Sequence, residues 1–188
     1  WANRQILMSL TAEIFERTLR VAPRELNMRL VYDVCHNIAK IESFDIDGAS
    51  RKLCVHRKGA TRAYPAGHES VPARYRQVGQ PVLIPGDMGV GSYILVGQQK
   101  AMSETFGSAC HGAGRVMSRT QALKSGRGRS ISRELAEQGV LVMAGSKGTL
   151  SEEMPDAYKN LNDVVDVVHA AGIAKKVARL KSVACVKG

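Results

Sequence analysis

The sequence predicts an α+β fold in one mixed structural unit, and three observations support this prediction. Short apolar runs of strand-like composition alternate with segments that place apolar residues at helical spacing. Loops rich in glycine and proline separate these segments. The chain of 188 residues contains no internal repeat, low-complexity linker or break in composition that would divide it. With 44% hydrophobic residues, it is long enough to bury one sizeable apolar core.

The elements are predicted in the following order. A helix is expected over residues 4–20, because its apolar residues recur at amphipathic spacing, and it should end before Pro23. Residues 28–41 predict a strand that leads into a polar turn at residues 35–37, with a helix as the alternative. Further strands are predicted at residues 52–56, 81–84, 92–96 and 140–144. Further helices are predicted at residues 116–123, 131–137 and 161–170.

The charge balance is the most informative feature of the composition. The chain has 27 Lys and Arg against 17 Asp and Glu, a formal net charge of +10, and its pI is near 9.7. An excess of basic residues favours contacts with phosphate groups, so nucleic acid is the leading partner class. The alternative is that the charge serves solubility alone.

Nothing in the sequence predicts a membrane span or secretion. The longest apolar runs, residues 81–85 and 139–144, are far shorter than the roughly 20 residues that a spanning helix requires. Charged residues from Arg4 onward interrupt every stretch that could form a signal peptide. The four cysteines form no CxxC pair, which favours reduced, buried thiols. We therefore expect a cytoplasmic protein with no membrane partner, and the helix-like start at Trp1 indicates part of a longer polypeptide.

The strongest candidate site is the segment SACHGAGRVMSR, residues 108–119. Here His111 opens a glycine-rich turn ahead of a predicted helix. Glycines let backbone N–H groups approach a phosphate, and the helix amino end, Arg115 and Arg119 can add positive charge. A neutral imidazole in such a cradle can attack a phosphate and form a phosphoramidate. On spacing alone, a structural histidine at a glycine-rich helix entry explains the pattern equally well.

Four other segments contain candidate functional residues, with a weaker signal in each. YDVCHN places His36 at a polar turn where an imidazole could bind a divalent metal, although a lone histidine is more often structural. HRKGATR, residues 56–62, is a basic cluster that suits phosphate or forms a solvated loop. IPGDMGVGS, residues 84–92, resembles a nucleotide-contacting turn without the P-loop pattern. The final apolar strand could hold Lys187 as a phosphate-facing cation, whereas most terminal lysines are frayed.

Taken together, these segments resemble the RtcB family of RNA-splicing ligases. The motifs in the family's order are WANRQ, YDVCHNIAK, HRKGATRA, PGDMGVGSY, HGAGRVMSR and the terminal VKG, and they extend over essentially the whole chain. The resemblance implies that residues 1–188 are the carboxy-terminal part of an RtcB-like catalytic domain. Such a unit is incomplete without its upstream half, which is therefore an expected partner.

The resemblance also implies roles for individual residues. His111 corresponds to the histidine that accepts GMP from GTP, and His36 corresponds to a manganese ligand. Lys58 and Arg62 should face RNA phosphates. The implied guanylate contacts are Asn37, Pro85, Gly86, Asp87, Met88, Ser92, His111, Gly112, Ala113, Gly114, Tyr158 and Lys187. Some family members carry serine at the position of Asp87, so a hydroxyl contact to the nucleotide is not expected from this chain.

The implied activity is GTP- and Mn²⁺-dependent joining of RNA 3′-phosphate or 2′,3′-cyclic phosphate ends to 5′-hydroxyl ends, in tRNA splicing and RNA repair. Two Mn²⁺ ions and RNA substrates such as tRNA halves are expected, and a requirement for the partner archease stays open. This chain supplies only His36 to the metal site, because the family's other ligands lie upstream. Two alternatives remain: a non-catalytic RNA-binding remnant without a complete metal site, and a histidine-dependent nucleotide hydrolase.

Overall fold

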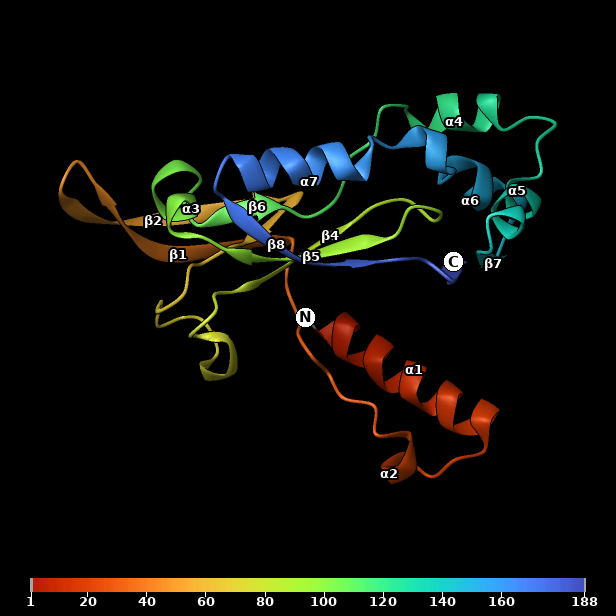
Figure 1. Cartoon of the computed structure of the whole chain (residues 1–188), viewed down its shortest axis with the longest axis horizontal. Helices are drawn as coiled ribbons and strands as arrows, with labels where there is room; N and C mark the ends of the chain where they lie inside the picture. Colours follow the sequence, from red (N-terminus) through yellow and green to blue (C-terminus); the bar gives the residue numbers. More distant parts are fainter. Residues whose placement is uncertain (1, 188) are drawn as a thin grey trace. The chain divides into compact units, whose positions relative to one another are not determined.

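The computed structural model describes residues 2–187, which fold into helices and strands as the α+β prediction requires (Figure 1). The chain forms two compact units, residues 1–35 and residues 36–188. The sequence shows no break in composition at this boundary, which lies inside the YDVCHN motif. No helix of the described part has the length and apolarity needed to cross a bilayer.

The first unit consists of helix α1 (Ala2–Leu19), helix α2 (Pro23–Leu26) and an extended segment that follows them. The predicted first helix is confirmed, but none of its residues is buried and its apolar side chains do not gather on one face. The prediction for residues 28–41 is wrong over residues 28–36, which form neither strand nor helix. Arg4 of α1 donates to both carboxylate oxygens of Asp33, so this segment is attached to the helix by side-chain hydrogen bonds.

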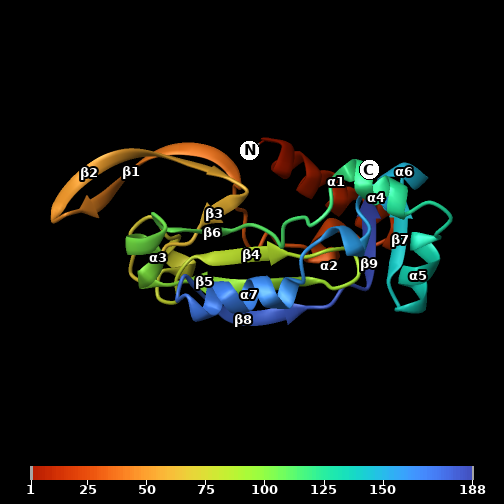
Figure 2. The ribbon, with the colours of Figure 1, turned by 90° about the horizontal axis from the view of Figure 1, so that it is seen from above.

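The second unit begins with a long antiparallel hairpin of β1 (Asn37–Ile46) and β2 (Ala49–Lys58), which is drawn in orange at the left of Figure 2. Asp47 and Gly48 both have positive φ, 54° and 76°, which suits the two-residue turn that matches strand twist. The strand predicted at residues 52–56 is confirmed within β2. The register pairs Asn37 with Lys58, so the hairpin brings the ends of two sequence motifs together.

A three-stranded antiparallel sheet forms the centre of the second unit, in the order β4 (Pro81–Pro85), β5 (Ser92–Gly97) and β8 (Ala174–Leu180). Helix α7 (Leu161–Ala170) covers one face of this sheet (Figure 1). Leu161 and Val165 of the helix are fully buried against Val82, Ile84 and Leu95. The predictions of β4, β5 and α7 are confirmed. Strand β8 was not predicted, because basic residues interrupt its apolar pattern, as is common on edge strands.

Two further strand pairs flank the sheet. The short strands β3 (Ala60–Arg62) and β6 (Ser108–Cys110) pair antiparallel, whereas β7 (Leu141–Ala144) and β9 (Ala184–Lys187) pair parallel. The predicted strand at residues 140–144 and the predicted terminal strand are thereby confirmed. Strands of three residues such as β3 and β6 carry too little periodicity to be predicted from sequence.

Short helices complete the second unit: α3 (Gln99–Glu104), α4 (Arg119–Ser125), α5 (Ile131–Glu137), α6 (Lys147–Glu152), and the 3₁₀ turns η1 (Ala73–Tyr75) and η2 (Pro155–Ala157). The prediction of α5 is confirmed, and α3 and α6 were not predicted. Helix α4 begins three residues later than expected, because Ser118 and Gln121 form a capping box. The amino end of α4 is therefore separate from the turn that His111 opens.

Candidate active site

Two histidines from distant parts of the sequence form the centre of the candidate site. The rings of His36 and His111 stack with their centroids 4.5 Å apart and their planes 20° from parallel. Gly59 links the two backbones: its N–H donates to the carbonyl of His36 at 3.1 Å, and its carbonyl accepts from the N–H of His111 at 3.4 Å. The φ of Gly59 is +72°, so a residue with a side chain would be strained there. The β1–β2 register and the β3–β6 pairing thus converge on this glycine.

The stacked histidines face a cavity of about 400 Å³, which is lined by His36, Asn37, Lys58, Gly59 and His111. Three of the segments predicted to carry chemistry therefore meet at one place. Burial lowers the pKa of His111, and the neighbouring His36 lowers it further. Both effects favour the neutral imidazole, which is the form that can act as a nucleophile.

The glycine-rich turn after His111 packs against the loop that follows β4. The N–H of Ala113 donates to the carbonyl of Pro85 at 3.1 Å, and a Cβ at Gly112 would lie 3.4 Å from the same oxygen. That distance is an ordinary van der Waals contact, so Pro85 does not by itself require glycine at position 112. The two segments predicted to contact the guanylate are therefore in direct contact with each other.

The carboxylate of Asp87 accepts hydrogen bonds from backbone N–H groups of its own loop. It accepts from the N–H of Gly89 at 2.8 Å and from the N–H of Val90 at 3.0 Å, which closes the turn before β5. The side chain of Met88 is 3% exposed and packs into an apolar cluster with α4 and α5. Any contact of Met88 with a nucleotide must therefore come from its backbone. Ser92 is half-buried at the start of β5, opposite Pro85.

Tyr158 and Lys187 belong to a second polar cluster around Glu153. The guanidinium of Arg115 donates to Glu153 at 3.2 Å and to the hydroxyl of Tyr158 at 3.1 Å, and it lies 5.0 Å from the centroid of the Tyr158 ring. Lys187 lies 3.9 Å from the Glu153 carboxylate. Arg115 also donates to the carbonyls of Met117 and Glu152, so its predicted phosphate contact competes with four internal acceptors.

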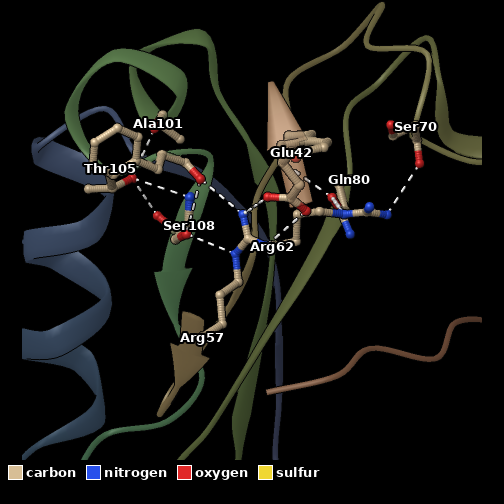
Figure 3. A network of polar contacts seen from close by, with 10 residues as sticks. Glu42, Arg57, Arg62, Ser70, Gln80, Ala101, Thr105 and Ser108 are labelled. Atoms are coloured by element: carbon tan, nitrogen blue, oxygen red, sulfur yellow. Dashed lines mark hydrogen bonds and ion pairs between the residues drawn. The ribbon is translucent and has the colours of Figure 1, made fainter. Parts of the chain in front are cut away.

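The arginines near the hairpin are also engaged in internal contacts (Figure 3). Arg62 donates to the Gln80 amide oxygen at 3.1 Å and to the Ser70 carbonyl at 3.2 Å, so its predicted contact with RNA competes with these acceptors. Arg57 is buried in an ion pair with Glu42. Lys58, in contrast, is exposed at the cavity.

The residues present do not form a metal centre by themselves. Among residues 2–187, no three His, Cys, Asp or Glu side chains gather closely enough to hold a metal ion. The imidazole of His36 has His111 as its aromatic neighbour. A manganese site at His36 would therefore need donor groups from beyond this chain.

Sequence reasoning missed Glu153, Glu42 and Arg57. Glu153 stands in a run of acidic residues outside every motif, so no local signal marks it. Arg57 lies within the basic cluster HRKGATR, but the sequence does not show which of its cations is buried.

Comparison with known proteins identifies the family. The model of the family described as tRNA-splicing ligase RtcB matches residues 1–188. Proteins named tRNA-splicing ligase RtcB are 55% identical in Archaeoglobus fulgidus, 54% in Pyrococcus abyssi and 52% in Thermococcus kodakarensis, each over the whole of this chain. The chain covers 39%, 20% and 39% of these relatives, respectively. The motifs and these matches together show that the chain belongs to the RtcB family of tRNA-splicing ligases.

Proposed function

We propose that the full-length protein is a GTP-dependent RNA ligase in which His111 carries the guanylyl group. The main support for this proposal is the position of His111: an imidazole at a cavity, stacked on His36 and beside Lys58, in a chain of this family. A protein that only binds RNA has no need of a nucleophile in such a place.

The proposed reaction has three transfers. A ring nitrogen of His111 attacks the α-phosphorus of GTP, so a P–N bond forms while the P–O bond to pyrophosphate breaks. An oxygen of an RNA 3′-phosphate then attacks the guanylyl phosphorus, which forms a P–O–P linkage and releases His111. Finally, the 5′-hydroxyl of a second RNA end attacks the activated 3′-phosphorus, so a phosphodiester forms and GMP and a proton leave. A 2′,3′-cyclic phosphate end is first hydrolysed to a 3′-phosphate.

Several residues support these steps. The ammonium of Lys58 is exposed at the cavity and can stabilise negative charge on the transferred phosphate. No atom lies within 4 Å of where a Cβ of Gly114 would be, so the backbone there is open to the close approach of a phosphate. The Tyr158 hydroxyl already donates to Glu153 and accepts from Arg115, so we propose that Tyr158 offers guanine its ring for stacking.

Manganese and the RNA partners are part of the proposal. His36 would contribute one imidazole to a site of two Mn²⁺ ions whose other donors come from the rest of the protein. When bound, such ions would neutralise phosphate charge. The names of the relatives and the net charge of +10 support RNA, and tRNA halves in particular, as the substrate.

Covalent labelling of the full-length protein tests the proposal. With GTP radiolabelled at the α-phosphate and Mn²⁺, the wild type should acquire a label that is labile in acid and stable in base, as a phosphoramidate is. His111→Ala should abolish the label, whereas His169→Gln, an exposed residue of α7, should leave it unchanged. Undiminished labelling of His111→Ala would place the nucleophile elsewhere. An unlabelled wild type that still binds RNA would favour the non-catalytic alternative, and GMP release without joined RNA would favour the hydrolase.

A further inference from the structure

Glu153, which belongs to no recognised motif, is the centre of a four-residue cluster. It follows the last residue of α6, and its side chain is 18% exposed. One carboxylate oxygen accepts from Arg115 at 3.2 Å. The other accepts from the hydroxyl of Tyr158 and lies 3.9 Å from the ammonium of Lys187. A single carboxylate therefore contacts three donors from three separate segments of the chain.

These three segments contain residues of the proposed nucleotide site, so their relative positions matter for binding. Arg115 ends the HGAGR turn that begins with His111, Tyr158 follows η2, and Lys187 ends β9. Backbone contacts connect the first two, because Arg115 and Tyr158 form an isolated β-bridge and the N–H of Lys159 donates to the carbonyl of Gly114 at 2.9 Å. Lys187 is held by the pairing of β9 with β7, and its carbonyl accepts from the N–H of Gly145 at 2.9 Å. The side chain of Lys187 is connected to those of Arg115 and Tyr158 through the carboxylate of Glu153.

The charges explain why a carboxylate is needed. Arg115 and Lys187 are both cations, and without an anion between them they repel each other in a partly desolvated place. Tyr158 would also lose the acceptor for its hydroxyl proton, so its ring would no longer be held in one orientation.

We propose that Glu153 is a positioning residue of the nucleotide site. Its carboxylate holds the side chains of Tyr158 and Lys187 in place relative to the turn that contains His111. This inference rests on the proposed function, because Tyr158 and Lys187 contact the guanylate only under that proposal. Glu153 itself need not touch the nucleotide. Its effect should appear mainly in the binding of GTP, since the attacking atom belongs to His111.

Single-turnover guanylylation of the full-length protein at increasing GTP concentration tests this role. Glu153→Gln should raise the KM for GTP about tenfold and change the maximal rate less, because the amide keeps the shape but loses the charge. Glu153→Asp should give an intermediate KM, because it keeps the charge on a shorter side chain. Glu137→Gln is the matched control, since Glu137 is 68% exposed and pairs only with the neighbouring Arg133 on the same helix; its KM should equal that of the wild type.

A double-mutant cycle separates positioning from a loss of stability. If Glu153 acts by orienting Tyr158, Glu153→Gln should raise the KM less in a Tyr158→Phe protein than in the wild type. Should Glu153→Gln fail to fold, Glu153→Asp and Tyr158→Phe complete the same cycle. A wild-type KM in folded Glu153→Gln and Glu153→Asp, or fully additive effects in the cycle, would overturn the positioning role alone. A wild type that GTP does not label would overturn the proposed function together with it.

Discussion

The buried ion pair between Glu42 and Arg57 makes a quantitative prediction about how the hairpin is fixed to the strand that precedes His111. The two side chains are 9% and 1% exposed. Both terminal nitrogens of Arg57 donate to Glu42, at 3.0 and 2.7 Å. The same guanidinium donates to Ser108 Oγ and to the carbonyl of Phe106, both at 2.9 Å (Figure 3). Arg57 of β2 is thereby tied to β6 and the residues just before it.

Glu42→Leu should therefore destabilise the protein strongly. Removing one partner of a buried pair leaves the other charge without compensation, which costs about 3–5 kcal/mol. The double variant Glu42→Leu/Arg57→Met should recover much of this loss, because it removes the buried charge as well. The exposed pair of Arg133 and Glu137 provides the control, since its side chains are 81% and 68% exposed and Glu137→Leu should cost less than about 1 kcal/mol.

Chemical unfolding of the full-length protein, followed by circular dichroism, measures these differences. A loss below about 1 kcal/mol in Glu42→Leu would contradict this prediction, since it would mean that water reaches Arg57 and that the pair is not desolvated. A double variant no more stable than Glu42→Leu would refute it as well, because the uncompensated charge could not then be the cause.

Four other perturbations have defined outcomes. His36→Ala should weaken Mn²⁺ binding by the full-length protein and leave its melting temperature nearly unchanged; equal affinities in calorimetry would contradict a ligand role. Lys187→Met should slow guanylylation roughly tenfold, equivalent to about 1.4 kcal/mol of barrier, and Lys187→Arg should recover part of the rate. Wild-type kinetics in Lys187→Met would exclude a contact between Lys187 and the guanylate. Asp87→Ala should lower the free energy of unfolding by about 1–3 kcal/mol, because two loop amides lose their acceptor, and Asp87→Ser should lose less. Burial, and then the charge of Arg62, lower the pKa of His68 below its usual 6.5. The unfolded state therefore binds this proton more readily, so the free energy of unfolding should fall as the pH drops below about 6.5. His68→Gln should reduce this loss of stability in acid. A pKa of His68 at or above 6.5 in an NMR titration would contradict the prediction.

The strands and helices that have a clear apolar pattern could be predicted from the amino-acid sequence. β4 and β5 are short apolar runs between glycine and proline loops, and α5 and α7 have periodic apolar residues and boundaries close to those predicted. The motifs also sufficed to point to the family, and within it they make His111 the candidate nucleophile. These features are local, so composition, spacing and order along the chain contain the information that specifies them.

The contacts between distant segments, in contrast, could be seen only in the folded structure. The stacking of His36 on His111 depends on the β1–β2 register, on the β3–β6 pairing and on one glycine between them. Such pairings join residues far apart in the sequence, and local periodicity contains no information about which strands will pair.

The roles of similar side chains were likewise decided by their surroundings. Arg57 and Lys58 are adjacent cations in one motif, yet one is buried against Glu42 and the other is exposed at the cavity. Because successive side chains of a strand point to opposite faces, the packing of β2 settles which of the two meets solvent. Glu153 acquires its three donors in the same way, because the HGAGR turn, the residue after η2 and β9 bring Arg115, Tyr158 and Lys187 to one carboxylate that the sequence leaves unmarked.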